Sequence, residues 1–499
     1  MLSTILWLPV IGALAIALLP KPQSKNIAII TSSLVVVLSL GLLTQFDIHN
    51  PDFQLSENLP WLENLGLNYS LGIDGLSLPL VLLNGLLTWL VICFGDRQIK
   101  ERQQLFYSLI LLIHAGVNGA ILATNTLLFV LFYELELIPL YLAIAVWGGA
   151  QRSYAATKFL LFTALSGILV LVGILALGWL SANPIPNFDY HTLQHLSLPI
   201  DVQITLLLVL LLGFTIKAPF VPFHTWLPDT YVESTTPVVM MLGGIVAKLG
   251  TYGLFRFCLG LFPEAWTIIS PWVALWAGLG ILYGAMTAIA QKDIKRMVAY
   301  SSIGHMSYIL LAAAAATPLS LVGGITQMVS HGLVLALLFY LVGVIEEKVG
   351  TRDLDVLNGL LNPLRGLPTT SALLILGGMA SAGIPGLVGF VAEFLVFQGS
   401  FAKFPIPTIF SIIGSGLTAV YFVILLNRTC FGKLDNNTAY YPKVTGLEQL
   451  PALILTGIII FLGIQPIWLT RWSEAITVPM ADQIVSFAEV SLELSEIND

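Results

Sequence analysis

Apolar runs recur along almost the whole of this 499-residue chain. Many of them are long enough to cross a hydrocarbon core of roughly 30 Å, which takes about 20 residues of helix. Only 10% of the residues are charged and 57% are hydrophobic, whereas about 25% are charged in a soluble domain. The sequence therefore predicts an all-α integral membrane protein. Since no basic stripe exists, nucleic acid is not expected as a partner.

The apolar runs predict fourteen transmembrane helices. Two are interrupted by proline close to a charged residue, one at Lys217-Ala218-Pro219 and one at Pro385-Gly386 before Glu393. Paired interrupted helices are typical of transporter repeats. We therefore expect N-terminal helices in 1–104, one repeat in 105–260, a second in 261–432, and a last helix with a C-terminal tail in 433–499. The expected helices lie near 3–20, 27–46, 76–94, 105–123, 125–147, 155–181, 203–220, 236–260, 267–289, 297–316, 318–345, 369–400, 407–427 and 449–470.

The basic residues orient these helices. Three of them, Arg256, Lys403 and Arg471, flank the even-numbered loops or lie in the tail, and sixteen belong to the odd-numbered loops. Since Lys and Arg concentrate in cytoplasmic loops, both termini are expected on the non-cytoplasmic side. The sixteen are Lys21, Lys25, Arg97, Lys100, Arg102, Arg152, Lys158, Lys292, Lys295, Arg296, Lys348, Arg352, Arg365, Arg428, Lys433 and Lys443.

A further set of charged or titratable residues lies inside the apolar runs. An ionised side chain near the bilayer centre costs at least about 2.5 kcal/mol, so it needs a partner, water or a function. Histidine titrates near neutral pH, and carboxylates and amines can exchange protons with it through waters. We hypothesise a proton path, although any single member could be a static ion pair. The set is Glu134, Glu136, Lys217, Lys248, His305, His331 and Glu393.

The cysteines give no indication of a redox centre. Cys93, Cys258 and Cys430 are far apart in the sequence, and none belongs to a CxxC pair. Neither an iron–sulfur cluster nor a zinc site is therefore predicted. If the chain belongs to a redox complex, we expect the redox chemistry in other subunits.

Four segments resemble the antiporter-like, proton-pumping subunits of complex I. They are FTIKAPFVPFHTWLPD from Phe214, QKDIKRMVAYSSIGHM from Gln291, His331-Gly332, and PGLVGFVAEF from Pro385. The resemblance covers nearly the whole chain. It implies fourteen helices with two inverted five-helix repeats, and an ion pair between Glu134 and Lys217. It assigns the proton path to Glu134, Lys217, Lys248, His305, His331 and Glu393, with Glu136, Lys158, His224 and Asp229 in supporting positions.

The length and Glu393 resemble the chain 4 (M- or D-type) branch, and the segment from Tyr133 to Pro139 is similar to its cyanobacterial and plastid version. This resemblance implies a thylakoid complex that passes electrons from ferredoxin or NAD(P)H to plastoquinone. Plastoquinone, iron–sulfur clusters and the electron donor would bind to other subunits, and this chain would bind no cofactor. Expected partners are lipids and the other membrane subunits, including a longer L/F-type subunit.

One position departs from the family pattern. Tyr231 stands where the family usually has histidine, and the segment from Asn427 to Gly432 is similar to variant subunits used in cyanobacterial carbon dioxide uptake. These features favour the uptake variant over a respiratory or cyclic-electron-flow form. Two alternatives stay open: a subunit of a multisubunit Na⁺/H⁺ antiporter, and a scaffold that conducts nothing.

Overall fold

The computed structural model describes residues 1–20, 23–95, 99–182, 184–434 and 441–498. Lys21 and Arg97, two of the charges used to orient the chain, lie outside these residues. Within the described ranges, 12 helical spans are long and apolar enough to cross a membrane. Two shorter apolar helices, Leu2–Leu18 and Val388–Phe401, join them. The class of a helical, multi-pass membrane protein is thus confirmed, and a total of fourteen crossings stays a prediction.

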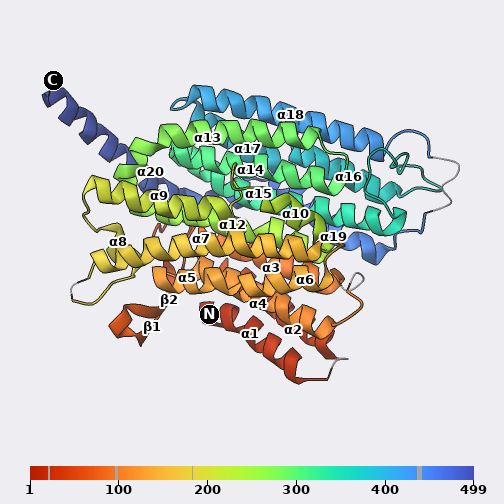
Figure 1. Ribbon diagram of the computed structural model, residues 1–499, viewed down its shortest axis with the longest axis horizontal. Coiled ribbons are helices and arrows are strands. Elements are labelled where there is room, and N and C mark those ends of the chain that lie inside the picture. The colour runs from red at the N-terminus through yellow and green to blue at the C-terminus, as the bar shows by residue number, and fades with distance from the viewer. Residues whose placement is uncertain (21–22, 96–98, 183, 435–440, 499) are drawn as a thin grey trace.

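Most of the helices run along the long axis of the molecule (Figure 1). The first half of the chain contains α1 (Leu2–Leu18), α2 (Ser24–Leu42), α3 (Ser77–Phe94), α4 (Gln103–Leu122), α5 (Thr126–Leu135), α6 (Leu137–Trp147), α7 (Arg152–Leu180), α8 (Tyr190–Gln194), α9 (Ile200–Lys217), α10 (Trp226–Glu233), α11 (Thr236–Met241) and α12 (Lys248–Gly253). The second half contains α13 (Pro263–Ile289), α14 (Ile294–Ala315), α15 (Pro318–Val349), α16 (Pro368–Ser381), α17 (Val388–Phe401), α18 (Pro405–Thr429), α19 (Gly446–Ile464) and α20 (Ile467–Asn498).

Both helix breaks predicted from proline are present. Helix α9 ends at Lys217, and the chain crosses Pro219 and Pro222 before α10 begins. Helix α16 ends at Ser381, and α17 begins at Val388. Between them Gly383 and Gly386 have φ angles of +69° and +91°, which glycine adopts at little cost. Each break leaves backbone groups without their helical partners beside a charged side chain.

Two further irregularities were not predicted. The expected helix 125–147 is divided at Glu136, where α5 ends and α6 begins. Pro139 explains this division, because it cannot donate a hydrogen bond to the carbonyl of Leu135. The expected helix 236–260 contains two π-helical segments, Leu242–Val246 and Leu254–Leu259, on either side of α12. Such π-helical segments are often found at functional sites.

The all-helical expectation missed a β-hairpin. Strands β1 (Gln54–Leu62) and β2 (Leu67–Ile73) pair antiparallel between α2 and α3. Gly66, with a φ of +67°, closes the turn. The amino group of Met1 forms an ion pair of 2.6 Å with Glu57 of β1, which ties the N-terminus to the hairpin. A search for long apolar runs cannot detect strands of 9 and 7 residues.

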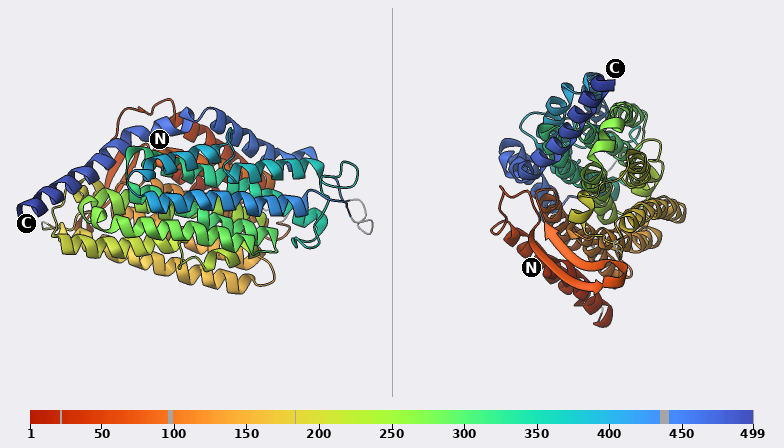
Figure 2. Two further views of the ribbon diagram at one scale, coloured as in Figure 1. Left: turned by 90° about the horizontal axis from the view of Figure 1, so that it is seen from above. Right: turned by 90° about the vertical axis from the view of Figure 1, so that its left-hand side faces the viewer.

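The expected C-terminal tail is also helical. Helix α20 starts at Ile467 and runs to Asn498. It projects from the end of the bundle that carries the hairpin, which we call the hairpin end (Figures 1 and 2). Its first half packs against α13 and α15.

The core of the bundle consists of α14, α15 and the span from α11 to Leu259, which are almost entirely buried. Helix α14 packs along α13 and α15, and α17 packs along α15. Side chains that point inward from these central spans are therefore shielded from lipid. Lys248, His305 and His331 all lie on them.

The orientation can be tested directly. Reporters fused after Arg296 and after Arg365 are expected in the cytoplasm, and a reporter fused to the C-terminus on the opposite side. The reason is the sixteen-to-three distribution of basic residues over alternate loops. Activity of a paired enzyme reporter, active on one side of the membrane only, measures this. A C-terminal reporter in the cytoplasm would mean that the helix count is wrong by an odd number.

Candidate functional site

Lys217 forms a buried ion pair with Glu136, and the predicted pairing with Glu134 is wrong. The Lys217 and Glu136 side chains are 1% and 0% exposed. The Lys217 Nζ also lies 4.5 Å from the centroid of the Tyr133 ring. Residues two apart on a helix point about 200° apart, so Glu134 and Glu136 cannot both face Lys217. The turn between α5 and α6 directs Glu136 to the lysine.

Glu134 instead faces α7. A Cβ atom on Gly167 of α7 would lie only 1.8 Å from the Glu134 Oε1 atom, so the carboxylate occupies the space that a side chain at position 167 would fill. The Glu134 side chain is half-buried, and its Oε1 atom has no hydrogen-bond partner among the described residues. The Glu134 carboxylate is therefore less buried than that of Glu136 and borders α7.

Lys248 lies in the middle of the irregular span. Its ammonium donates a hydrogen bond to the carbonyl of Gly243, in the preceding π-helical segment. It also lies 3.0 Å from Nδ1 of His331 on α15. Gly244 and Gly332 permit this contact, because a Cβ on Gly332 would lie 2.5 Å from the carbonyl oxygen of Gly244. Two glycines thus bring the two backbones close enough for the lysine to reach the imidazole.

From His331 the polar chain continues to α17. The rings of His331 and His305 have centroids 5.5 Å apart. His305 Nδ1 lies 3.6 Å from Oε1 of Glu393. The break between α16 and α17 supplies Ser381, whose hydroxyl is 2.9 Å from His305 Nε2. Ser415 of α18 donates a 2.7 Å hydrogen bond to Glu393 Oε2.

The four residues Lys248, His331, His305 and Glu393 therefore form a continuous buried row, which we call the central row. They are 0%, 4%, 5% and 3% exposed. Each neighbouring pair is either within hydrogen-bond range or close enough for one intervening water. The row is joined to Lys217 through the backbone, since Gly250 packs against the amide of Ala218.

The remaining predicted residues lie apart from this row. Asp229 on α10 forms ion pairs with Lys158 at 2.8 Å and with Arg296 at 3.2 Å. Lys158 is thus held by a carboxylate on a neighbouring helix. His224, in the break after α9, lies 3.1 Å from the Tyr283 hydroxyl. His114 is hydrogen-bonded to Thr88 and Asn118, as expected for a helix contact.

One member of the central row and one member of the Lys217–Glu136 pair retain unused hydrogen-bonding capacity. Glu136 Oε2 and His331 Nε2 have no partner among the described residues, although both atoms are buried. Buried polar atoms are normally paired, and the exceptions need an explanation. A group that accepts and releases protons needs such a free position. Within the same described part of the chain, no three His, Cys, Asp or Glu side chains are grouped to hold a metal ion.

Sequence reasoning missed the direct role of Glu136, the hydroxyl groups of Ser381 and Ser415, and the burial of Arg256. Arg256 was counted as a loop charge, but it is 3% exposed and pairs with Asp74. The hydroxyls could not be found, since serine is common in membrane helices. Arg256 had a detectable signal, because it lies inside the apolar run 236–260.

Comparison with known proteins identifies the family of the chain. A family profile described as "NADH:quinone oxidoreductase/Mrp antiporter, TM" matches residues 123–418. A relative from Synechococcus elongatus, named NAD(P)H-quinone oxidoreductase chain 4 2, is 37% identical over 99% of this chain and 95% of its own. A chain of respiratory complex I from Thermus thermophilus with bound NADH is 27% identical, with a TM-score of 0.89 over 97% of this chain and 100% of that chain. A chain of the Mrp complex from Dietzia sp. DQ12-45-1b shares the fold at 20% identity, with a TM-score of 0.84 over 98% of this chain and 99% of that chain.

The fold and the buried row thus define a membrane subunit of the class that complex I-type oxidoreductases and multisubunit antiporters share. The chain belongs to the NADH:quinone oxidoreductase/Mrp antiporter membrane-subunit family. The family resemblance that the four sequence segments indicated is therefore confirmed.

Proposed function

We propose that this chain translocates protons as a chain 4-type membrane subunit of a photosynthetic complex I-type oxidoreductase. The central row carries the proposal: Lys248, His331, His305 and Glu393 lie in sequence through the most buried part of the bundle. In this proposal protons move along the row through side chains and intervening waters. The Lys217–Glu136 pair, at the first broken helix, is the second charged element of the path.

A static role for these charges is the weaker explanation. Buried ion pairs stabilise a protein little, and apolar residues of similar volume often replace them without loss. A merely structural bundle would therefore not need four titratable side chains in a row. The free positions on Glu136 and His331 also favour a dynamic role, because a structural network is stable only when all its members are satisfied.

The remaining parts of the proposal follow from the family resemblance of the four sequence segments and, for the termini, from the distribution of basic residues. Electrons would pass from NAD(P)H or ferredoxin to plastoquinone in other subunits, within a thylakoid complex that includes a longer L/F-type subunit. The two broken helices would belong to two inverted units, 105–260 and 261–432. Both termini would lie on the non-cytoplasmic side.

The proposal is tested on vesicles that contain the purified complex. Quinone reduction should acidify or alkalinise the lumen at the same rate in sodium-free and sodium-containing buffer. A strict requirement for sodium would favour the antiporter alternative, and electron transfer without proton movement would favour a scaffold. Identifying the co-purifying subunits would establish the assembly.

Within this function, we further propose the carbon dioxide-uptake form. Tyr231, which replaces the family histidine, is fully buried in α10, and its hydroxyl has no partner among the described residues. Its ring packs against Phe339 with centroids 5.5 Å apart. It also borders Gly243, since a Cβ there would lie 3.3 Å from the Tyr231 Cε2 atom. Because Gly243 holds Lys248, a phenol that does not titrate near neutral pH would alter proton delivery to the row.

Deletion of this chain from its host tests the uptake form. Growth is expected to slow under limiting carbon dioxide and to stay normal when carbon dioxide is abundant, with respiration unchanged. The growth rate at both carbon dioxide levels and respiratory oxygen consumption are the measurements. Loss of respiratory electron flow with normal carbon uptake would contradict the uptake form and leave the proton-pumping proposal standing.

A further inference from the structure

We propose that the buried Arg256–Asp74 ion pair is a fixed-charge barrier that prevents the protons of Lys248 from leaving through the hairpin end. This inference rests on the proposed proton path, and it gives a role to two charges outside that path. Without such a barrier, a proton on Lys248 could escape before it reaches Glu393. The structure supports the inference in three ways: the position of the pair, the hydrogen bonds that fix it, and the rings that enclose it.

Arg256 lies between Lys248 and a cavity at the hairpin end. Both residues belong to the same span, eight positions apart, which is about 12 Å along a helix. The cavity, of about 510 Å³, is lined by Arg256, Asp74 and Tyr190, and by residues of α20 such as Met480. The pair therefore separates this cavity from the interior of the span that carries the lysine.

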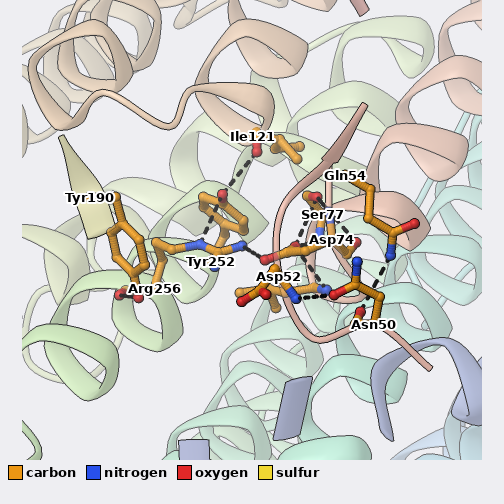
Figure 3. A network of polar contacts seen from close by, with 10 residues as sticks. Asn50, Asp52, Gln54, Asp74, Ser77, Ile121, Tyr190, Tyr252 and Arg256 are labelled. Atoms are coloured by element: carbon orange, nitrogen blue, oxygen red, sulfur yellow. Dashed lines mark hydrogen bonds and ion pairs between the residues drawn. The ribbon is translucent and has the colours of Figure 1, made fainter. Parts of the chain in front are cut away.

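Asp74 is positioned where β2 leads into α3, and its carboxylate accepts four hydrogen bonds (Figure 3). Oδ1 accepts hydrogen bonds from the Leu76 amide, the Ser77 amide and the Ser77 hydroxyl, at 3.0–3.1 Å. Oδ2 accepts a hydrogen bond from Nη2 of Arg256 at 2.5 Å. The turn before α3 therefore fixes one carboxylate oxygen of Asp74, and Arg256 fixes the other.

Aromatic rings enclose the guanidinium. The Arg256 Cζ atom lies 4.8, 5.3 and 5.4 Å from the ring centroids of Phe53, Tyr190 and Tyr252. Arg256 Nε also donates to the Tyr252 hydroxyl at 3.3 Å, and that hydroxyl donates to the carbonyl of Ile121 at 2.8 Å. Figure 3 shows this connected network. Phe53 and Asp74, which flank the hairpin, thus surround this side chain together with residues of α4, α8 and α12.

This chemistry suits a barrier and does not suit a relay. Arginine stays protonated in proteins and has no acceptor atom, so it cannot take up a proton. A fixed positive charge in a narrow passage excludes protons, as in water-selective pores. The central row has the opposite character, because His331 keeps a ring nitrogen without a partner. The protein therefore combines titratable groups along the row with a buried arginine that does not titrate, held by Asp74.

Passive proton leakage tests the barrier. We would purify the whole complex with Arg256→Gln alone, and with Arg256→Gln combined with Asp74→Asn, and place each in vesicles without electron donor. A potassium gradient with valinomycin would drive protons, and a lumenal dye would record them. Leakage on the order of tenfold above the parental complex is expected, because a charge barrier of this kind is worth several RT. The double variant keeps a hydrogen-bonding pair without charge, so it also tests the proposal if the single variant fails to assemble.

Three further variants make the result specific. Arg256→Lys retains the charge and is expected to leak protons no faster than the parental complex. The same result is expected for Arg471→Met, which removes an exposed arginine from α20. Adding Lys248→Met to the leaking variant should abolish the leak, since it removes the proton carrier behind the barrier. An assembled double variant that does not leak would overturn the barrier, and so would a leak that persists without Lys248. Neither result would affect the pumping proposal, which is measured separately under electron donation.

Discussion

Replacing Lys217 with alanine is expected to reduce proton translocation by at least about tenfold in an assembled complex. The lysine is the only partner shown for the buried Glu136 carboxylate among the described residues. Without it, a buried carboxylate is costly in its ionised form and takes up a proton instead. Removing one partner of a buried ion pair lowers the stability of a protein by about 3–5 kcal/mol. The path would therefore lose the lysine charge and the contact that positions Glu136. Protons moved per quinone reduced, measured in vesicles, give the result.

The same experiment distinguishes the two neighbouring carboxylates. Glu136→Gln combined with Lys217→Ala should be less severe than the sum of the single changes, with a coupling of roughly 0.5–3 kcal/mol for residues in contact. Glu134→Gln with Lys217→Ala should give a smaller coupling, because Glu134 faces Gly167. A native gel confirms that each complex is assembled. Normal pumping by the assembled Lys217→Ala complex would contradict the role of this pair.

Replacing His331 with glutamine is expected to lower proton translocation by about a hundredfold, the lower range for a positioned proton-transfer group. His331 is the residue that joins Lys248, 3.0 Å away, to the ring of His305. Glutamine has a similar size and can hydrogen-bond, but it cannot exchange a proton near neutral pH. The measurement is again protons per quinone, together with the rate of quinone reduction.

His114→Gln is the matched control. His114 is as deeply buried as His331, being 1% exposed against 4%, and it is hydrogen-bonded to Thr88 and Asn118 outside the central row. Its replacement should leave pumping close to the parental rate. If both substitutions reduced pumping equally, the loss would be a general effect of replacing a buried histidine. That result would contradict a specific proton-transfer role for His331.

The sequence predicted the features that depend on composition within one segment. The apolar runs, the prolines after Lys217 and near Glu393, and the buried titratable residues are all visible in one stretch of chain. Charges inside an apolar run are costly wherever the helix packs, so their importance did not depend on the fold. The family motifs extended this assignment to nearly the whole chain.

The features that were missed depend on contacts between segments. Which carboxylate faces Lys217 was decided by the turn at Glu136, and the composition of 125–147 does not contain that information. The Arg256–Asp74 pair joins residues 182 positions apart. The π-helical segments cannot be predicted from composition, because their hydrophobic residues are those of an ordinary membrane helix.

The π-helical segments also determine what kinds of change this chain tolerates. A π-helical turn holds more residues than an α-helical one, so it shifts the rotational phase of everything that follows it. One residue corresponds to about 100° of rotation in an α-helix. Removing a single apolar residue from 242–246 would restore regular hydrogen bonding, yet it would rotate Lys248 away from His331. At the apolar positions Leu242, Ile245 and Val246, a substitution that keeps the side-chain volume is therefore expected to be tolerated where a deletion is not.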